Sequence, residues 1–305
     1  MLYQPVPVRA PAERRLDRLE AAIVEAVTYA DIFDWPRTTA EIQRYLPVRA
    51  RLDEVEAALA ARPLRALTDS IDGVVMLPGR EALAGARRRR AAASASLWPQ
   101  AIRYGRLIAS LPFVRLVAVS GSLAIGAADE AADVDLFVVA EDGRLWLTRA
   151  LVVAVVRVAA TRGVRLCPNY LLAASGLALQ ERDRFTAHEL AQLVPIAGIE
   201  AHQALLERNA WFRDFLPNHP GPPAPEWRPA ARGVRRLAER VLRAGPFDRL
   251  ERWEMERKVA RLSAEAGADS ETRFDATMCK GHVGGHRRRA DEAFRRRLVE
   301  IGAVS

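Results

Sequence analysis

The clearest alternation of apolar and polar positions lies between residues 116 and 139. An apolar run over 116–119 predicts a buried strand, and the strand ends at a turn of small residues at 120–122. Residues 123–128 are compatible with a helix, and 133–139 form a second apolar run that begins with two acids. The pattern therefore predicts strand, turn, short helix and strand, with acidic residues close to the turn.

The two acids at the start of the second strand are Asp133 and Asp135. Side chains at positions i and i+2 of a strand point to the same face, so Val134 points into the core while both carboxylates face one way. Two close carboxylates repel each other unless a cation lies between them, and Mg²⁺ prefers carboxylates together with substrate phosphates. Gly121 allows the backbone to approach a phosphate, and Ser122 adds a hydroxyl near a helix N-terminus. The combination predicts metal-assisted phosphoryl or nucleotidyl transfer; the alternative is a surface strand whose acids are only solvated.

The first 79 residues have a different pattern, with helices predicted over 14–33, 40–46 and 48–62 and strands over 64–67 and 74–77. Three helices and a hairpin make a winged helix, which binds DNA through basic residues on its third helix. Acids and bases are mixed on the predicted third helix: Asp53, Glu54, Glu56, Arg49, Arg51 and Arg62. The mixture favours a structural or partner-docking module, and DNA is kept only as a less favoured partner.

A long helix over 80–111, interrupted near Pro99, is expected to lead into the first strand. Four consecutive arginines at 87–90 fan around this helix and predict a solvated basic surface, with contact to a triphosphate or to RNA as the alternative. After the second strand we expect a helix over 144–161 across the back of the sheet and a third strand over 164–173.

Helices dominate the remainder of the predicted chain. Thr186 is expected to cap a helix that runs to residue 194, with Glu189 completing a capping box. Residues 217–229 contain six prolines and predict an extended linker. Further helices are predicted over 200–215, 233–244, 247–264 and 291–301.

Together these elements predict an α/β (α+β) protein with a short mixed sheet. With 305 residues, half of them hydrophobic, the chain is long enough to bury a large core. The predicted parts are a winged-helix-like module (1–79), a core with its leading helix (80–216), a Pro-rich linker (217–229) and a C-terminal helical region (230–305).

The net charge of +8 favours anionic partners such as nucleotides, nucleic acid or an acidic protein, with Arg-rich coding DNA as the plainer explanation.

Cys167 and Cys279 lie far apart, which fits a reducing cytoplasm without disulfides, and Cys167 has no local histidine that would make it a nucleophile. The longest apolar run, 145–160, is interrupted by Arg149 and Arg157 and is too short to cross a membrane. No signal-peptide pattern begins the sequence. We therefore expect a cytoplasmic protein with no membrane partner.

The residues Gly121-Ser122, ten intervening positions and then Asp133-Val134-Asp135 resemble the Gly-Ser…Asp-x-Asp signature of the DNA polymerase beta-like nucleotidyltransferase superfamily. The resemblance covers about residues 114–175. The order of a winged helix before the core is also similar to a group of bacterial predicted nucleotidyltransferases of undefined substrate.

The resemblance implies a polymerase beta-like nucleotidyltransferase core and a nucleoside triphosphate (NTP) donor. It implies that Asp133 and Asp135 hold Mg²⁺, with Mn²⁺ as an alternative, and act as catalytic residues. Ser120, Gly121 and Ser122 would then hold the phosphates of the nucleotide.

One position departs from the family pattern. A third metal-binding carboxylate is usual on an antiparallel strand here, where this chain has Asn169. An amide oxygen can bind Mg²⁺ but cannot act as a general base, so Asn169 is kept as a catalytic candidate, with Asp183 and Glu189 as candidates for the missing acid. Lys280, beside His282 in a glycine-rich tail, is a candidate for binding nucleotide phosphate.

The predicted activity is Mg²⁺-dependent transfer of a nucleoside monophosphate (NMP) from an NTP to an acceptor hydroxyl, with release of pyrophosphate. The acceptor stays open between a small molecule, a protein and RNA. The alternative is a non-catalytic regulator that binds DNA through the winged helix and uses a degenerate core as a nucleotide sensor. Asn169 favours this alternative, and the intact acid pair disfavours it.

Overall fold

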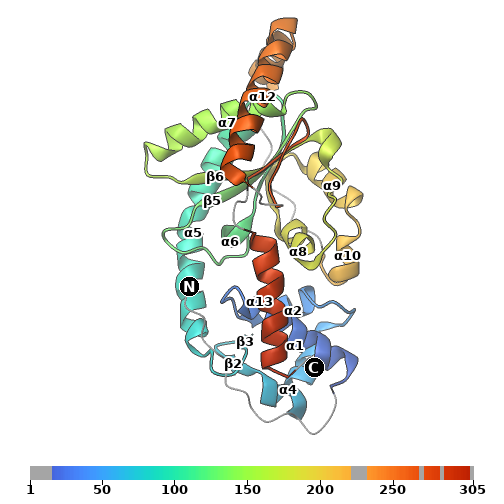
Figure 1. Ribbon diagram of the computed structural model, residues 1–305. Helices are drawn as coiled ribbons and strands as arrows, with labels where there is room; N and C mark the ends of the chain where they lie inside the picture. The colour runs from blue at the N-terminus through green and yellow to red at the C-terminus, as the bar shows by residue number, and fades with distance from the viewer. Residues whose placement is uncertain (1–15, 221–231, 268–270, 282–284, 303–305) are drawn as a thin grey trace.

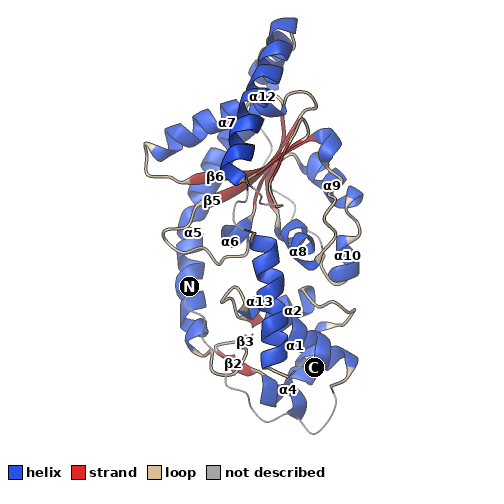
Figure 2. Cartoon of the chain, viewed as in Figure 1, coloured by secondary structure: helices blue, strands red, loops and turns tan. Residues whose placement is uncertain are grey.

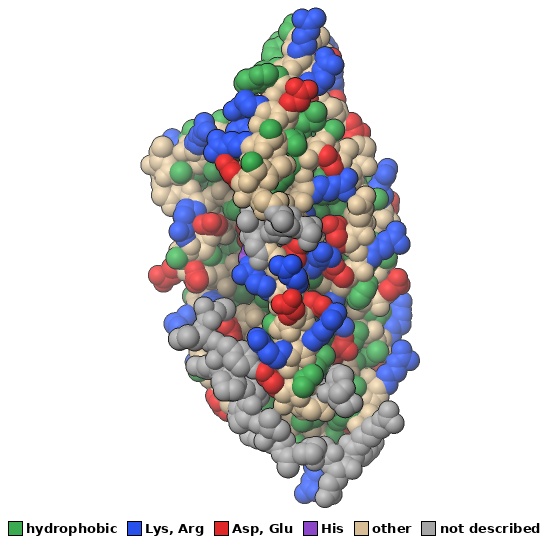
Figure 3. Space-filling view, viewed as in Figure 1, with side chains coloured by type: hydrophobic (Ala, Val, Ile, Leu, Met, Phe, Trp, Pro, Cys, Tyr) green, Lys and Arg blue, Asp and Glu red, His purple; other side chains and the backbone are tan. Residues whose placement is uncertain are grey.

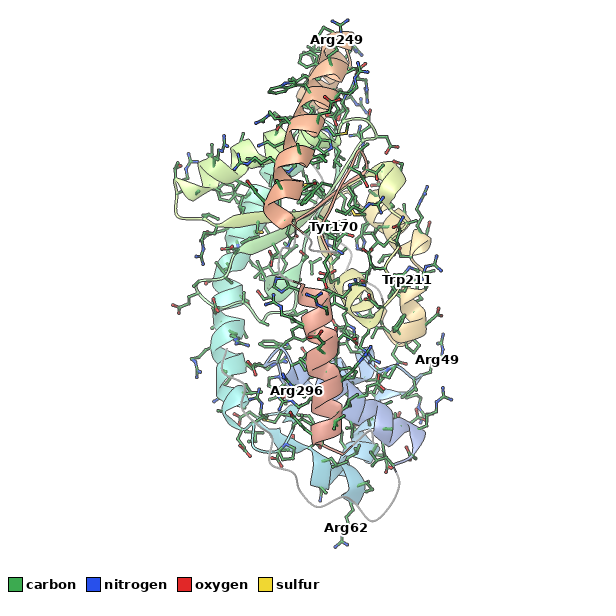
Figure 4. All side chains as sticks on the ribbon, in the orientation of Figure 1. Arg49, Arg62, Tyr170, Trp211, Arg249 and Arg296 are labelled. Atoms are coloured by element: carbon green, nitrogen blue, oxygen red, sulfur yellow. The ribbon has the colours of Figure 1, made fainter. Side chains whose placement is uncertain are left out.

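The computed structural model describes residues 16–220, 232–267, 271–281 and 285–302. The molecule is elongated, with the N-terminal elements at one end and helix α12 projecting from the other (Figure 1). Arg62 and Arg249 lie at these opposite ends (Figure 4). Between them lies a sheet with helices on both sides, so the architecture is mixed α/β (Figure 2).

The N-terminal module has its own core, in which α1, α2 and α3 pack around Ile23, Ile42 and Val55. Its three-stranded sheet has the order β1-β3-β2. Residues 64–67, predicted as a strand, instead belong to a helix, because Pro63 fixes a helical φ in its first turn. The elements are α1 (Arg18–Asp31), β1 (Arg37–Thr38), α2 (Thr39–Arg44), α3 (Leu52–Ala60), α4 (Arg62–Leu67), β2 (Asp69–Ile71) and β3 (Val74–Met76).

The central sheet has six strands in the order β7-β4-β5-β6-β9-β8. The strands are β4 (Val114–Val119), β5 (Val134–Ala140), β6 (Leu166–Ala173), β7 (Val194–Ala197), β8 (Arg273–Phe274) and β9 (Met278–Lys280). The expectation of an antiparallel third strand is wrong: β6 runs parallel to β5, because helix α7 (Leu145–Ala160) carries the chain back across the sheet. The other neighbouring pairs are antiparallel, so the sheet is mixed.

Side chains of β4 alternate between two layers of helices. Val117 and Val119 face α5 (Ala82–Ala109) and α7, while Leu116 and Ala118 face the helices that follow β6. Those helices are α8 (Arg184–Gln192), α9 (Ile199–Arg208) and α10 (Phe212–Phe215), reached through the short 3₁₀ turn η1 (Ala174–Gly176).

Two predicted helix boundaries differ from the structure. The predicted break at Pro99 is wrong, because α5 continues through this residue; one lost backbone hydrogen bond is outweighed by the packing of Ala101, Tyr104 and Ile108 in the core. The predicted helix over 200–215 is divided at the buried Asn209, whose amide donates to the Leu177 carbonyl oxygen at 2.6 Å.

The last part of the chain closes onto the core. Helices α11 (Arg232–Leu242) and α12 (Gly245–Ala266) precede β8 and β9, and α13 (His286–Glu300) lies along the front of the molecule against α1 and α8 (Figure 1). Arg297 of α13 forms an ion pair with Asp31 of α1 at 3.1 Å, and Arg80 reaches the same carboxylate at 3.0 Å. No helix in the described ranges combines the length and the apolar character that a membrane crossing needs.

Candidate active site

The glycine turn after β4 lies directly against the acid of β5. Gly121 has a φ of +64°, which side chains other than glycine rarely adopt, and a Cβ atom there would collide with the carboxylate of Asp135. The Ser120 N–H donates to the Asp135 carbonyl oxygen at 3.0 Å. The close approach of turn and acid, which the sequence predicted, is present in the structure.

Asp135 is partly buried and held from two sides. Asn169 donates from Nδ2 to Oδ1 of Asp135 at 3.0 Å, and the thiol of Cys167 forms a further hydrogen bond with the same carboxylate. Burial, and then the charge of Asp133, raise the pKa of Asp135 to about 6. Burial and the same two acids raise the pKa of Cys167 to about 12, so it is a protonated donor and not a nucleophile.

Asp133 lies immediately before β5 and is more open. Its side chain is 50% exposed and forms an ion pair at 2.9 Å with Arg165. The side chain of Arg165 is also exposed. An exposed ion pair of this kind contributes little free energy. The carboxylate is therefore available to a cation that binds beside Asp135.

The oxygen atoms around the acid pair fit a hard cation. The Asn169 Oδ1 atom is buried and has no hydrogen-bond partner, while its Nδ2 is bound to Asp135. Within the described part of the chain, no three His, Cys, Asp or Glu side chains form a metal-binding group. The candidate ligand set therefore consists of two carboxylates and one amide oxygen, which suits Mg²⁺ when phosphate oxygens complete it.

A cleft of about 360 Å³ opens beside the glycine turn. Helix α6 (Gly121–Ala124) follows the turn, and the side chain of Ser120 makes no capping hydrogen bond to it. Gly121 and Ser122 line one side of the cleft, and aromatic side chains of the N-terminal module line the other. The aromatic residues are Tyr29, Phe33 and Trp35.

Glu189 faces the same cleft from α8. The predicted capping box is wrong: Asp183, not Thr186, caps α8, and its carboxylate accepts from the Thr186 N–H at 2.9 Å. Asp183 also pairs with Arg287 at 2.9 Å, and these hydrogen bonds lower its pKa, so it is already engaged. Glu189 does not cap α8, and it forms no ion pair within the described residues. Burial raises its pKa to about 7 against the opposing charge of Lys280.

Lys280 reaches the same region from β9. It is buried beside Tyr170, with Nζ 5.3 Å from the ring centroid and 3.7 Å from a carboxylate oxygen of Glu181. Tyr170 lies at the centre of the molecule in Figure 4. The prediction of a loop lysine among glycines is wrong, because Lys280 is paired in the sheet with Tyr170; His282 lies outside the described residues.

The four arginines at 87–90 do not form the predicted solvated surface as a group. Arg87 pairs with Glu41 at 2.8 Å, Arg88 pairs with Asp72, and Arg90 donates to the backbone oxygen of Asp34 at 3.1 Å. These contacts attach α5 to the N-terminal module. Three of the four arginines therefore hold α5 to the N-terminal module, and Arg90 also lines the cleft.

Three further cleft residues have no sequence signal that would have identified them. Tyr29, Arg37 and His188 come from α1, β1 and α8, and each is at least nine-tenths buried. His188 is buried between the rings of Tyr29 and Tyr45, 4.4 and 5.4 Å from their centroids. Only the fold brings these residues together.

The arrangement can bind a phosphorylated ligand with a cation. The glycine turn lines the cleft and lies against the carboxylate of Asp135, and Glu189, with a pKa of about 7, lines the same cleft. Comparison of the chain with family models, with curated proteins and with solved structures gave no match in any of the three.

Proposed function

We propose that the protein is a Mg²⁺-dependent nucleotidyltransferase with a polymerase beta-like core. The observation that supports it most is the close approach of Gly121 to the Asp135 carboxylate, which puts a glycine turn beside the acid that would bind the cation. The order α5-β4-α6-β5-α7-β6, with the turn after β4 and the acids at the start of β5, also fits such a core.

Asp133, Asp135 and the Asn169 Oδ1 atom would hold the cation, which supplies charge neutralisation for the triphosphate and polarisation of the α-phosphate. Gly121 and Ser122 would hold the β- and γ-phosphates through backbone and hydroxyl groups. Orientation of the two substrates and stabilisation of developing charge would supply most of the rate.

Glu189 would take the proton of the acceptor hydroxyl. The base cannot be Asn169, and Asp183 is engaged as a helix cap and ion-pair partner. Glu189 lines the cleft, and a pKa of about 7 is close to the value at which a general base works best at neutral pH. The acceptor hydroxyl, whether on a small molecule, a protein or RNA, would lie within reach of this carboxylate.

The test is calorimetry of the protein with each of the four NTPs and Mg²⁺, combined with an assay of pyrophosphate release. Asp135→Asn should abolish Mg²⁺-dependent NTP binding and leave the melting temperature close to that of the wild type. The matched control is Asp214→Asn, because Asp214 is exposed on α10, away from the cleft. Full NTP binding by Asp135→Asn would contradict the proposal.

The alternative of a DNA-binding regulator has less support. Arg51, the residue before α3, is paired with Asp53 of that helix at 2.7 Å, and the face of the molecule in Figure 3 mixes acidic with basic side chains. Salt-dependent DNA binding without NTP binding would favour this alternative over the enzyme.

A further inference from the structure

The cleft beside the glycine turn extends from the core to the N-terminal module. Gly121, Ser122 and Glu189 line it on the core side, and Tyr29 and Arg37 line it on the module side. A ligand of the size that the cleft of about 360 Å³ admits, bound at the turn, therefore extends toward the module.

Arg37 is a buried charge without an ion-pair partner among the described residues. Only 5% of the residue is exposed, and although burial lowers its pKa, a guanidinium stays charged in proteins. No carboxylate of the described residues forms an ion pair with it, since the neighbouring Glu41 is paired with Arg87 at 2.8 Å. The guanidinium is stacked 4.2 Å from the ring centroid of Tyr45, and its Nη1 atom has no hydrogen-bond partner. A buried, unpaired charge is costly unless a ligand supplies the opposite charge.

The other buried arginines of the described chain have carboxylate partners. Arg80 forms an ion pair with Asp31 at 3.0 Å, and Arg297 reaches the same acid at 3.1 Å. Both are as deeply buried as Arg37, so burial without a carboxylate is a particular property of Arg37. Arg37 lines the cleft and also a smaller pocket of about 210 Å³ beside Tyr45, and of the two only the cleft also contains Gly121 and Ser122.

Two further residues that line the cleft, one from each side, have unpartnered polar atoms. The Tyr29 hydroxyl and the His188 Nε2 atom are buried without a hydrogen bond. The Nδ1 atom of His188 lies 2.9 Å from the Arg184 carbonyl oxygen and donates to it, so Nε2 is the acceptor. The cleft therefore offers a positive charge and a hydroxyl donor to an anionic group, and an acceptor to a donor group of the same ligand.

We propose that Arg37 binds the terminal phosphate of the NTP, so that the N-terminal module completes the donor site. The proposal rests on the proposed function, in which Gly121 and Ser122 hold the β- and γ-phosphates from the core side of the cleft; Arg37 would contact the same γ-phosphate from the module side. A planar guanidinium fixed on an aromatic ring matches two phosphate oxygens at once. A nucleoside monophosphate is too short to make this contact, so the module distinguishes nucleotides by the number of their phosphates.

Calorimetry of the full chain with Mg²⁺ tests this with three probes: the preferred NTP, the corresponding NMP and inorganic triphosphate. Arg37→Gln should weaken binding of the NTP and of inorganic triphosphate at least about tenfold and leave NMP binding unchanged. Arg37→Lys keeps the charge but not the fork of donors, so its affinity for the NTP should lie between those of the wild type and of Arg37→Gln. The matched control is Arg49→Gln, because Arg49 is exposed on the same module outside the cleft (Figure 4).

A second readout separates binding from folding. Without nucleotide, Arg37→Gln should melt at the same or a higher temperature than the wild type, because it removes an uncompensated buried charge. Equal NTP affinity in Arg37→Gln and wild type, or equal weakening of NTP and NMP, would overturn the role of Arg37 alone. Absence of NTP binding by the wild-type protein would overturn the proposed function and this inference together.

Discussion

Gly121 is subject to two separate constraints, a positive φ and the contact with the Asp135 carboxylate. Gly121→Ala should therefore lower stability by about 1–2 kcal/mol through backbone strain, and also displace the carboxylate and abolish Mg²⁺-dependent NTP binding. Thermal melting and calorimetry measure the two effects.

Gly143→Ala is the matched control for this substitution. Gly143 has a similar φ of +68°, but no atom lies within 4 Å of the position that its Cβ would take. It should lose similar stability and keep NTP binding. Equal NTP binding by the two variants would show that the contact between turn and acid does not contribute to nucleotide binding.

Glu189 makes both stability and activity depend on pH. Burial raises its pKa from an ordinary 4.5 to about 7, so between these values the folded protein binds a proton that the unfolded chain has lost. Its contribution to stability is present below pH 4.5 and is lost as the pH rises through 7. Glu189→Gln should therefore melt higher than the wild type at pH 8 and show no such gain at pH 4.

The same substitution should remove the rise of activity with pH that has its midpoint near 7. The rate of pyrophosphate release measured from pH 5 to 9 would show this. A Glu189→Gln protein with the wild-type rate and pH profile would exclude the carboxyl as the base.

At the level of elements, α1 and α13 are joined through one buried acid. Asp31 contacts Arg80 and Arg297, and all three are buried. Asp31→Asn removes the buried carboxylate that both guanidiniums share, while Arg80 keeps Asp34 and Arg297 keeps Glu300, and should cost about 3 kcal/mol. Denaturant unfolding measures this. Asp53→Asn, in the exposed pair with Arg51, should leave the midpoint unchanged; a similar loss in both variants would contradict this account.

The elements that could be predicted from the sequence are those with long apolar runs. Strands β4, β5 and β6, helix α7 and the glycine turn were predicted within a few residues, because their patterns are periodic over a whole element. Strands β7, β8 and β9 were missed, since two to four residues are too few to show a period and their pairing is set by distant strands.

The candidate site was predictable to a similar degree. Asp133, Asp135 and Gly121 are close in sequence, and their spacing fixes their relation on neighbouring strands. Arg37 and His188 could not be identified, because each joins the cleft through contacts between the N-terminal module and α8.

At the level of the whole molecule, the cleft has walls from both the N-terminal module and the core. Nucleotide should therefore stabilise both together. At an NTP concentration one hundred times the dissociation constant, mass action adds about 2.7 kcal/mol of stability. Calorimetric melting should then show one transition that moves upward. Movement of one of two separate transitions would show that only one part binds the nucleotide.

The contact of α13 with α1, and of β9 with β6, also sets an order of events during synthesis. Helix α1 and strand β6 leave the ribosome well before residues 278–300. Until those residues emerge, Asp31 cannot form its ion pair with Arg297, and the edge of β6 that pairs with β9 stays open. Contacts between such distant segments form slowly, and an open strand edge can pair with another chain. Nascent chains stalled before residue 278 should therefore be the species that aggregates or recruits chaperones, while chains extended past residue 300 can close the sheet and fold.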